Sequence, residues 1–149
     1  MRPVLRKIIG SVADIVKYAC IVHCTLEYVG DFVICSGPSM EPTLHTNDVL
    51  LTEHFTPRLR DIKRGDILIV KCPTECEQLI CKRVTALPGD KVQVGYQSSV
   101  VIPMGHMWLE GDNYFNSLDS RSYGPVPQGL VRGRALMKVW PFSSAYVLK

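Results

Sequence analysis

The stretch LICKRVTAL, residues 79–87, decides how the body of this chain folds. We interpret it as a β-strand, in which successive side chains point to opposite faces with a period of two. The period places four residues on the apolar face: Ile80, Lys82, Val84 and Ala86. A lysine therefore points with the apolar set, toward the predicted core.

The rest of the body has the same character. Short apolar or β-branched runs alternate with Pro and Gly turns, and no second long helical pattern follows residue 35. The runs are DVLLTEHF (48–55), GDILIVK (65–71), KVQV (91–94), HMWLEG (106–111) and GRALMKVWPF (133–142). The sequence predicts a mostly-β domain, either a sandwich or a partial barrel.

Residues 1–35 differ from the body. The first seven residues of this segment include three basic ones, Arg2, Arg6 and Lys7. Apolar residues then follow at the spacing of one helical face. The pattern predicts a helix from about Val4 to about Tyr28.

Three interpretations of this helix stay open. A membrane span needs about 20 mostly apolar residues, and Asp14, Lys17 and Glu27 interrupt this one. The helix could span a membrane with its charges facing a partner helix, lie flat on a membrane surface, or pack as the core helix of a soluble protein. Its basic, amphipathic start also fits an organelle-targeting segment.

Composition narrows the class of protein. The chain has 149 residues, 46% hydrophobic and 21% charged, which fits one folded domain with a short appendage. The net charge of +3 comes without a long basic run, so no nucleic-acid partner is expected. The six cysteines show neither a pair of CxxC motifs nor a matching His cluster, so we interpret them as small buried or loop thiols. We expect no metal and no cofactor, and disulfide pairing stays open.

A serine in a rigid turn is the first candidate for chemistry. GPSMEPTL, residues 37–44, holds Ser39 between Pro38 and Pro42, and proline fixes the backbone around the hydroxyl. A serine nucleophile needs a base, most often histidine. No neighbouring Asp in a suggestive motif accompanies any of the candidates His45, His54 and His106.

Lys82 is an alternative base. Burial disfavours the ammonium form, and lowering a lysine pKa from about 10.4 to about 7–8 corresponds to about 4 kcal/mol. A neutral amine would then be available near physiological pH. The pattern also fits a lysine that snorkels at a strand end, and Lys138, between Leu136 and Trp140, shares it. The alternation alone therefore does not identify the base.

The stretch GDNYFNSLDSRSYGP, residues 111–125, has the composition of a surface loop. Asp119 and Arg121 could form a bidentate ion pair that holds this loop. Ser117 could hydrogen-bond a neighbouring amine.

Together these stretches resemble the type I signal peptidase family of Ser-Lys proteases over nearly the whole chain. Each family motif is moderately specific, and four in the right order are very specific. The motifs are Ser39-Met40-Glu41-Pro42-Thr43, then Arg64-Gly65-Asp66-Ile67-Leu68-Ile69-Val70, then Lys82-Arg83-Val84 with Gly89-Asp90, and last Gly111-Asp112-Asn113 with Ser117-Leu118-Asp119-Ser120-Arg121 and Gly124.

The resemblance implies a role for each matched residue. Ser39 is the nucleophile, Lys82 is the general base, and Ser117 orients the Lys82 amine. Asp119 and Arg121 brace the site. The pocket that reads the substrate residue before the cut would be formed by Cys35, Met40, Leu44 and Cys81.

One position departs from the family pattern. Bacterial relatives often carry a serine two residues before the nucleophile, where its side chain donates a hydrogen bond to the oxyanion. Here that position is Gly37. A backbone group or water must substitute, because losing one such donor can cost about 3 kcal/mol.

The short chain and its CSGPSMEPT variant (35–43) look most similar to the mitochondrial branch of the family. That implies a membrane anchor over residues 1–33 and a β-rich protease domain over 34–149, which faces the intermembrane space from the mitochondrial inner membrane. It also implies a heterodimer with a second, related catalytic subunit, and precursor proteins with sorting presequences as substrates.

Two other functions are considered. The chain could be a catalytically silent subunit that stabilises an active partner protease. It could also be a self-cleaving repressor-type Ser-Lys protein, although it has no DNA-binding motif.

Overall fold

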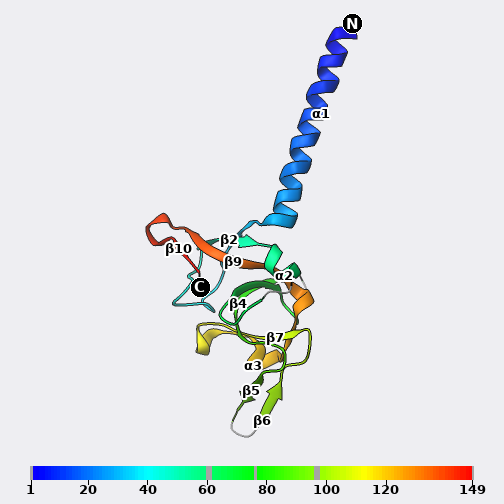
Figure 1. The fold of residues 1–149 in the computed structure, drawn as a ribbon. Coiled ribbons are helices and arrows are strands. Elements are labelled where there is room, and N and C mark those ends of the chain that lie inside the picture. The colour runs from blue at the N-terminus through cyan, green and yellow to red at the C-terminus, as the bar shows by residue number, and fades with distance from the viewer. Residues whose placement is uncertain (1, 60–61, 76, 96–97, 149) are drawn as a thin grey trace.

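A computed structural model describes residues 2–59, 62–75, 77–95 and 98–148. The chain begins with one long helix, α1 (Arg2–Cys24), which continues as a π-helical turn over Thr25–Val29. Figure 1 shows α1 projecting away from a β-rich body. The helix predicted over residues 4–28 is confirmed.

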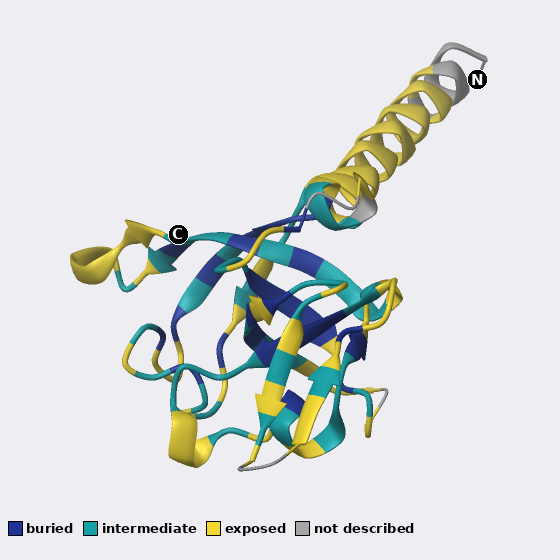
Figure 2. Ribbon diagram, turned by 60° about the horizontal axis from the view of Figure 1, so that its bottom comes forward, coloured by how far each residue is buried: buried dark blue, intermediate teal, exposed yellow. Residues whose placement is uncertain are grey.

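The side chains of α1 face away from the body. Each α1 residue whose burial is described is exposed (Figure 2). The stretch Ile9–Val29 has 21 residues and a mean hydropathy of 1.4, so by length and composition it could cross a membrane. The core-helix interpretation is wrong for this domain, because α1 is not packed in its core.

The body is built on one antiparallel sheet that curls around the interior (Figure 1). Among the described residues the strand order is β1-β2-β9-β3-β4-β7-β8, with β10 paired to β9, and β5 and β6 form a separate hairpin. The strands are β1 (Phe32–Ile34), β2 (Val49–Glu53), β3 (Ile67–Lys71), β4 (Leu79–Ala86), β5 (Lys91–Val94), β6 (Ser98–Val101), β7 (His106–Glu110), β8 (Val126–Pro127), β9 (Val131–Trp140) and β10 (Tyr146–Val147). The prediction of a mostly-β domain with one N-terminal helix is confirmed.

The six runs predicted as strands all contain strands. The sequence pattern does not reveal β1, β6, β8 and β10, which have only two to four residues and give alternation little length in which to show. Two short helices, α2 (Phe55–Leu59) and α3 (Ser120–Tyr123), are also unpredicted.

The alternation along β4 is confirmed around the lysine. Lys82 and Val84 are buried, and Thr85 is exposed. Because β4 pairs with β3 on one side and β7 on the other, it is an interior strand with a well-covered face. Val84 joins a core cluster that also contains Leu68, Val70, Met107, Leu109 and Val126.

A set of contacts fixes the end of α1 and its π-helical turn against the sheet. Arg132 on β9 donates hydrogen bonds of 2.9 and 2.8 Å to the two carboxylate oxygens of Glu27. Gly30 lies so close to β2 that a Cβ there would collide with the carbonyl oxygen of Thr52. These contacts set the direction in which α1 leaves the domain.

Candidate active site

Ser39 lies in a turn that its neighbours fasten to the core. The side chains of Met40 and Leu44 are only 3% and 1% exposed, and the N–H of Leu44 donates to the Met40 carbonyl at 2.9 Å. Before the serine, Gly37 has φ of 84°, a left-handed conformation that glycine adopts without strain. The hydroxyl is therefore carried by a backbone that is fixed on both sides.

The loop after β7 clamps this turn. Asn113 donates from its backbone N–H to the Ser39 carbonyl at 3.0 Å, and from its side-chain amide to the Pro38 carbonyl at 3.1 Å. Gly111 lies between Ser39 and Ser117, since a Cβ on it would collide with the Ser39 carbonyl oxygen and the Ser117 hydroxyl. Segments 75 residues apart in the sequence thus meet at the nucleophile turn.

Lys82 enters the same region from β4. Its side chain is 4% exposed. Burial lowers the pKa of Lys82 below the ordinary value of a lysine, and the negative charge of Asp119 opposes part of this effect. Within the described part of the chain, the Lys82 amine has no hydrogen-bond or ion-pair partner. Such an amine can be neutral and accept a proton.

Lys138, which has the same sequence pattern, has different surroundings. Its amine donates a hydrogen bond to the buried Asp48 carboxylate and lies over the ring of Tyr146. The tertiary structure thus distinguishes two lysines that the alternation pattern leaves equivalent.

Asp119 is the centre of the hydrogen bonds behind the nucleophile turn. It is fully buried and accepts hydrogen bonds from the Arg121 guanidinium at 2.8 and 2.7 Å, the Gly111 N–H at 2.9 Å and the Ser117 hydroxyl at 2.7 Å. Burial alone would raise the pKa of Asp119, but these hydrogen bonds outweigh it and lower the pKa to about 2. The expected ion pair with Arg121 is present, and the Ser117 hydroxyl donates to this carboxylate.

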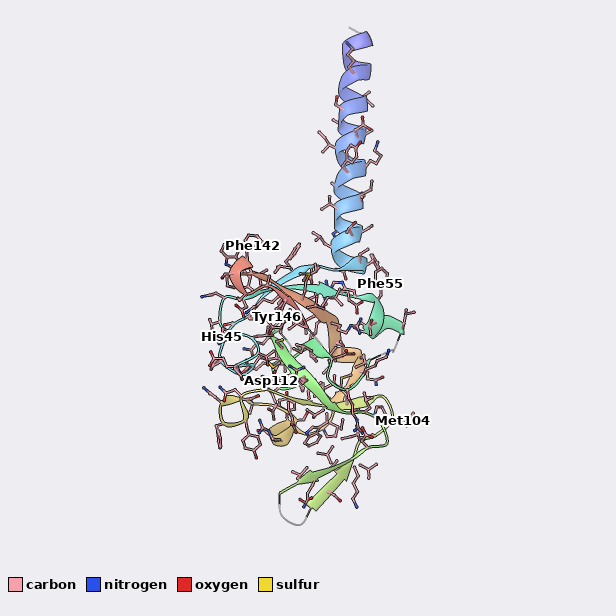
Figure 3. The ribbon with its side chains drawn as sticks, turned by 60° about the vertical axis from the view of Figure 1, so that its left-hand side comes forward. His45, Phe55, Met104, Asp112, Phe142 and Tyr146 are labelled. Carbon is pink, nitrogen blue, oxygen red and sulfur yellow. The ribbon has the colours of Figure 1, made fainter. Side chains whose placement is uncertain are left out.

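Ion pairs and hydrogen bonds join the remaining motifs. Arg83, next to Lys82, donates to both carboxylate oxygens of Asp112 at 2.9 and 2.7 Å, and to the Gly65 carbonyl at 2.9 Å. Figure 3 shows Asp112 within the β body, well away from α1. These contacts, with those of Asn113 to the Ser39 turn, bring residues of all four motifs together in the fold.

Ser39 and Lys82 line one cleft of about 480 Å³ between the end of β1 and the beginning of β4. Six residues predicted for the site contribute to its wall: Cys35, Ser39, Met40, Leu44, Cys81 and Lys82. The other three, Ser117, Asp119 and Arg121, do not line the cleft. They belong to the hydrogen-bonded group on the far side of Gly111 from Ser39.

Some functional positions escape the sequence interpretation. Leu79 and Leu118 are exposed leucines on the wall of the cleft, and although both lie in stretches quoted above, neither is predicted to line the site. Asn113 lies inside a recognised motif, but its function as a clamp on the nucleophile turn becomes visible only from its contacts.

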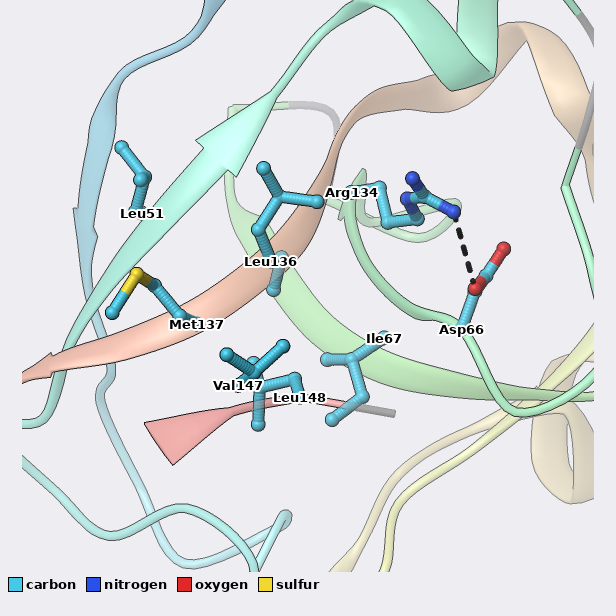
Figure 4. Close-up of a pocket in the computed structure, with 9 residues that line it drawn as sticks. Leu51, Asp66, Ile67, Arg134, Leu136, Met137, Val147 and Leu148 are labelled. Carbon is cyan, nitrogen blue, oxygen red and sulfur yellow. Dashed lines mark ion pairs between the residues drawn. The ribbon is translucent and has the colours of Figure 1, made fainter. Parts of the chain in front are cut away.

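A second pocket, of about 340 Å³, lies between β2, β3, β9 and the C-terminal strand β10 (Figure 4). Its wall is mainly apolar, and Arg134 and Asp66 form an ion pair of 3.5 Å there. None of the predicted site residues lines it. Across the described residues, no group of three or more His, Cys, Asp or Glu side chains is placed to hold a metal ion.

Comparison with known proteins now assigns the class. The family model of signal peptidase, peptidase S26, matches residues 8–102 and 94–140. The chain belongs to this family of peptidases.

Three relatives from this family match the chain at 41–49% sequence identity. "Mitochondrial inner membrane protease subunit 1" of Homo sapiens is 49% identical over 148 residues, covering 96% of this chain and 89% of the relative. The protein of the same name from Schizosaccharomyces pombe is 42% identical, covering 85% and 84%. "Mitochondrial inner membrane protease subunit 2" of Saccharomyces cerevisiae is 41% identical, covering 70% and 65%. The predicted resemblance to the mitochondrial branch is confirmed, and within that branch the chain is similar to proteins named subunit 1.

One solved structure also aligns with the chain. It is a signal peptidase I from Enterococcus faecalis V583, with a TM-score of 0.42 and 22% identity, covering 49% of this chain and 95% of that one.

Proposed function

We propose that this chain is a membrane-anchored serine endopeptidase in which Ser39 is the nucleophile and Lys82 is the general base. The observation that carries the proposal is that Ser39 and a buried, unpartnered Lys82 line the same cleft. The family membership supports peptide hydrolysis as the reaction.

The first step needs a neutral amine. The Ser39 hydroxyl attacks the scissile carbonyl carbon while the Lys82 amine takes the hydroxyl proton. The backbone N–H of Ser39 donates to the developing oxyanion. Gly37 has no side chain to add a second donor, so a further backbone group or a water completes that site.

The second step uses the proton that Lys82 has gained. The ammonium gives it to the leaving amine as the peptide bond breaks, and water then attacks the acyl-enzyme with Lys82 again as base. The buried negative charge of Asp119 stabilises the transient ammonium, since it acts to raise the pKa of Lys82. Burial and this charge together adjust the basicity of the amine.

The hydrogen-bonded group behind the turn orients the base. The Ser117 hydroxyl donates a hydrogen bond to Asp119. The lone pairs of its oxygen are therefore available to accept a hydrogen bond from the Lys82 amine. Arg121 fixes the Asp119 carboxylate. The structure contains no hydrogen bond between Lys82 and Ser117 among the described residues, so in this proposal that bond forms during the reaction, while Asp119 and Arg121 brace Ser117.

The cleft favours a small substrate residue before the cut. The preference for a small residue follows from the family resemblance, and the proposed pocket for this residue is formed by four side chains on the cleft wall: Cys35, Met40, Leu44 and Cys81. Apolar wall residues would suit a presequence that arrives from a membrane.

We place the enzyme at the mitochondrial inner membrane. Residues 1–33 form the anchor, and residues 34–149 form the protease domain on the intermembrane-space side. The proposed substrates are the sorting presequences of proteins delivered to that space, and the proposed partner is a second, related catalytic subunit in a heterodimer. The length of the apolar helix and the names of the relatives support this location.

The test is cleavage of an intermembrane-space precursor by membranes that carry the wild-type chain, Ser39→Ala or Lys82→Ala, across roughly pH 6 to 10. We expect wild-type activity to rise through a pKa below that of free lysine, and both variants to be inactive. Ser144→Ala and Lys71→Ala, at exposed positions, are matched controls that should cleave normally. Equal cleavage by wild type and Lys82→Ala would disprove the Ser-Lys assignment.

A mixed-subunit assay separates this proposal from the silent-subunit alternative. The chain carrying only Ser39→Ala is combined with an intact second subunit. Loss of cleavage of at least one precursor assigns catalysis to this chain. Full retention of every cleavage would favour a silent subunit.

A further inference from the structure

We infer that Cys35 and Cys81 form a reversible disulfide under mild peroxide oxidation, and that this bond switches the site off. The consequence for activity rests on the proposed function, whereas formation of the bond does not. The probe is hydrogen peroxide, which is small enough to enter the cleft.

The two thiols lie beside the two catalytic segments. Cys35 follows β1 directly and precedes the nucleophile turn by a few residues, and Cys81 immediately precedes Lys82 on β4. Both line the cleft. Cys81 packs against the core cluster that contains Cys35, and the two thiols are close enough for each to shift the pKa of the other. Both are free cysteines in this structure.

The surroundings make the two sulfurs unequal. The contact with Cys81 lowers the pKa of Cys35, while the same contact, reinforced by burial, raises the pKa of Cys81. The thiolate is the reactive form of cysteine. Cys35 is therefore the sulfur that reacts first, and Cys81 is the resolving thiol.

The chemistry balances with peroxide as the only oxidant. The Cys35 thiolate attacks one peroxide oxygen, the O–O bond breaks, and the released hydroxide takes up a proton to become water. Cys35 is then a sulfenic acid. The Cys81 sulfur attacks the Cys35 sulfur, the S–O bond breaks, and the hydroxyl leaves as water with the Cys81 proton. Two thiols are oxidised to a disulfide, and one peroxide is reduced to two waters.

Bond formation must disturb the geometry of the site. A disulfide holds its sulfurs at about 2.05 Å, much closer than two unbonded sulfur atoms can lie. Cys35 is held by backbone hydrogen bonds with Asp48 and Asn47 at 2.8 and 2.9 Å. Cys81 is held by the antiparallel pairing of β4 with β3, in which it lies opposite Ile69. The pull is therefore transmitted to the nucleophile turn and to the strand that carries the base. A misplacement of about 1 Å can cost about 100-fold in rate.

The experiment uses membranes that carry the full chain, first reduced and then titrated with hydrogen peroxide. Precursor cleavage and the mass of unreduced peptides are measured in parallel. We expect cleavage to fall at least tenfold as a peptide pair linked through Cys35 and Cys81 accumulates, and dithiothreitol to restore it. Full activity after complete formation of that link, or no such link at any peroxide dose, would overturn the inference.

Two variants make the result specific. Each is compared with its own reduced activity. Cys35→Ser should form no link and show no loss that dithiothreitol reverses, because it removes the sulfur that reacts first, whereas Cys72→Ser, which removes another thiol of the cleft wall, should respond like wild type. A reversible loss in Cys35→Ser would overturn the assignment. If the reduced wild-type chain cleaves nothing, the proposed function fails, and the mass map still decides whether the bond forms.

Discussion

The amine of Lys138 lies 3.1 Å from the Oδ2 oxygen of Asp48, and each of these two side chains is 6% exposed. Lys82 is buried to the same degree but has no such partner among the described residues. The two lysines share one sequence pattern, but in the part of the chain that the structure describes only the buried charge of Lys138 is compensated by a carboxylate. Burial of Lys82 should therefore cost more free energy of folding than burial of Lys138.

Replacing each lysine by methionine should therefore affect stability differently: the Lys82 variant should be as stable as wild type or more stable, and the Lys138 variant less stable. Lys82→Met should abolish cleavage and leave the thermal unfolding temperature unchanged or raised, because the residue is buried and its amine has no partner in the described part of the chain. Lys138→Met should lower stability by about 3–5 kcal/mol, because it leaves the Asp48 carboxylate buried without its cation. Thermal unfolding of the full chain in detergent measures both. A Lys82→Met chain that unfolds well below wild type would contradict the first expectation.

Removing the charge of Asp119 should shift the pH dependence of kcat/KM to lower pH. Asp119 raises the pKa of Lys82 against the larger lowering by burial, so Asp119→Asn should lower that pKa further. The midpoint of the rise in kcat/KM then moves to lower pH, provided that residual activity is measurable. Asp112→Asn, which breaks the pair with Arg83, is the control and should move the midpoint less. A midpoint that moves to higher pH would rule out this account.

Asp119 should also contribute to acid stability. Its folded-state pKa of about 2 lies below the ordinary value of 3.8, so its contribution is present above about pH 4 and is lost as the pH falls toward 2. The difference corresponds to about 2 kcal/mol. Urea unfolding at several pH values should show this loss in wild type and not in Asp119→Asn. Parallel pH curves for the two proteins would show that the carboxylate is not responsible.

A single methyl group should open the clamp on the nucleophile turn. Gly111→Ala places a Cβ against the Ser39 carbonyl and the Ser117 hydroxyl, and we expect at least a 100-fold loss of kcat/KM from the displaced nucleophile. Gly129→Ala is the matched control, since nothing lies within 4 Å of its Cβ. Cleavage by Gly111→Ala at the rate of the Gly129→Ala control would mean that the clamp does not position Ser39.

The contact between the anchor and the sheet should matter only for tethered substrates. Arg132→Ala removes the ion pair between Arg132 and Glu27. The two side chains are 36% and 39% exposed, so losing the pair should lower the free energy of unfolding by less than about 1 kcal/mol. We expect severalfold slower cleavage of a membrane-inserted precursor, because the cleft is no longer held in one orientation to the anchor. Cleavage of a short soluble peptide should be unchanged. An equal loss on both substrates would point to damage within the site instead.

The sequence pattern was most informative where the chain is regular. The period of two in β4 correctly places Lys82 on the buried face, and the helical spacing of residues 4–28 correctly predicts α1. The four motifs predict the family, because each lies within a short stretch of sequence. The pattern does not reveal β1, β6, β8 and β10, or that two exposed leucines line the cleft.

The sequence by itself determined the strand faces, the apolar N-terminal helix and the identity of the motif residues, because these depend on local periodicity and on side-chain chemistry. Only the tertiary structure decided which lysine is free and which is paired, since Asp48 reaches Lys138 across 90 residues. It also decided that Asn113 clamps the Ser39 turn and that Cys35 contacts Cys81. Such contacts depend on how distant segments are brought together, and no local pattern encodes that arrangement.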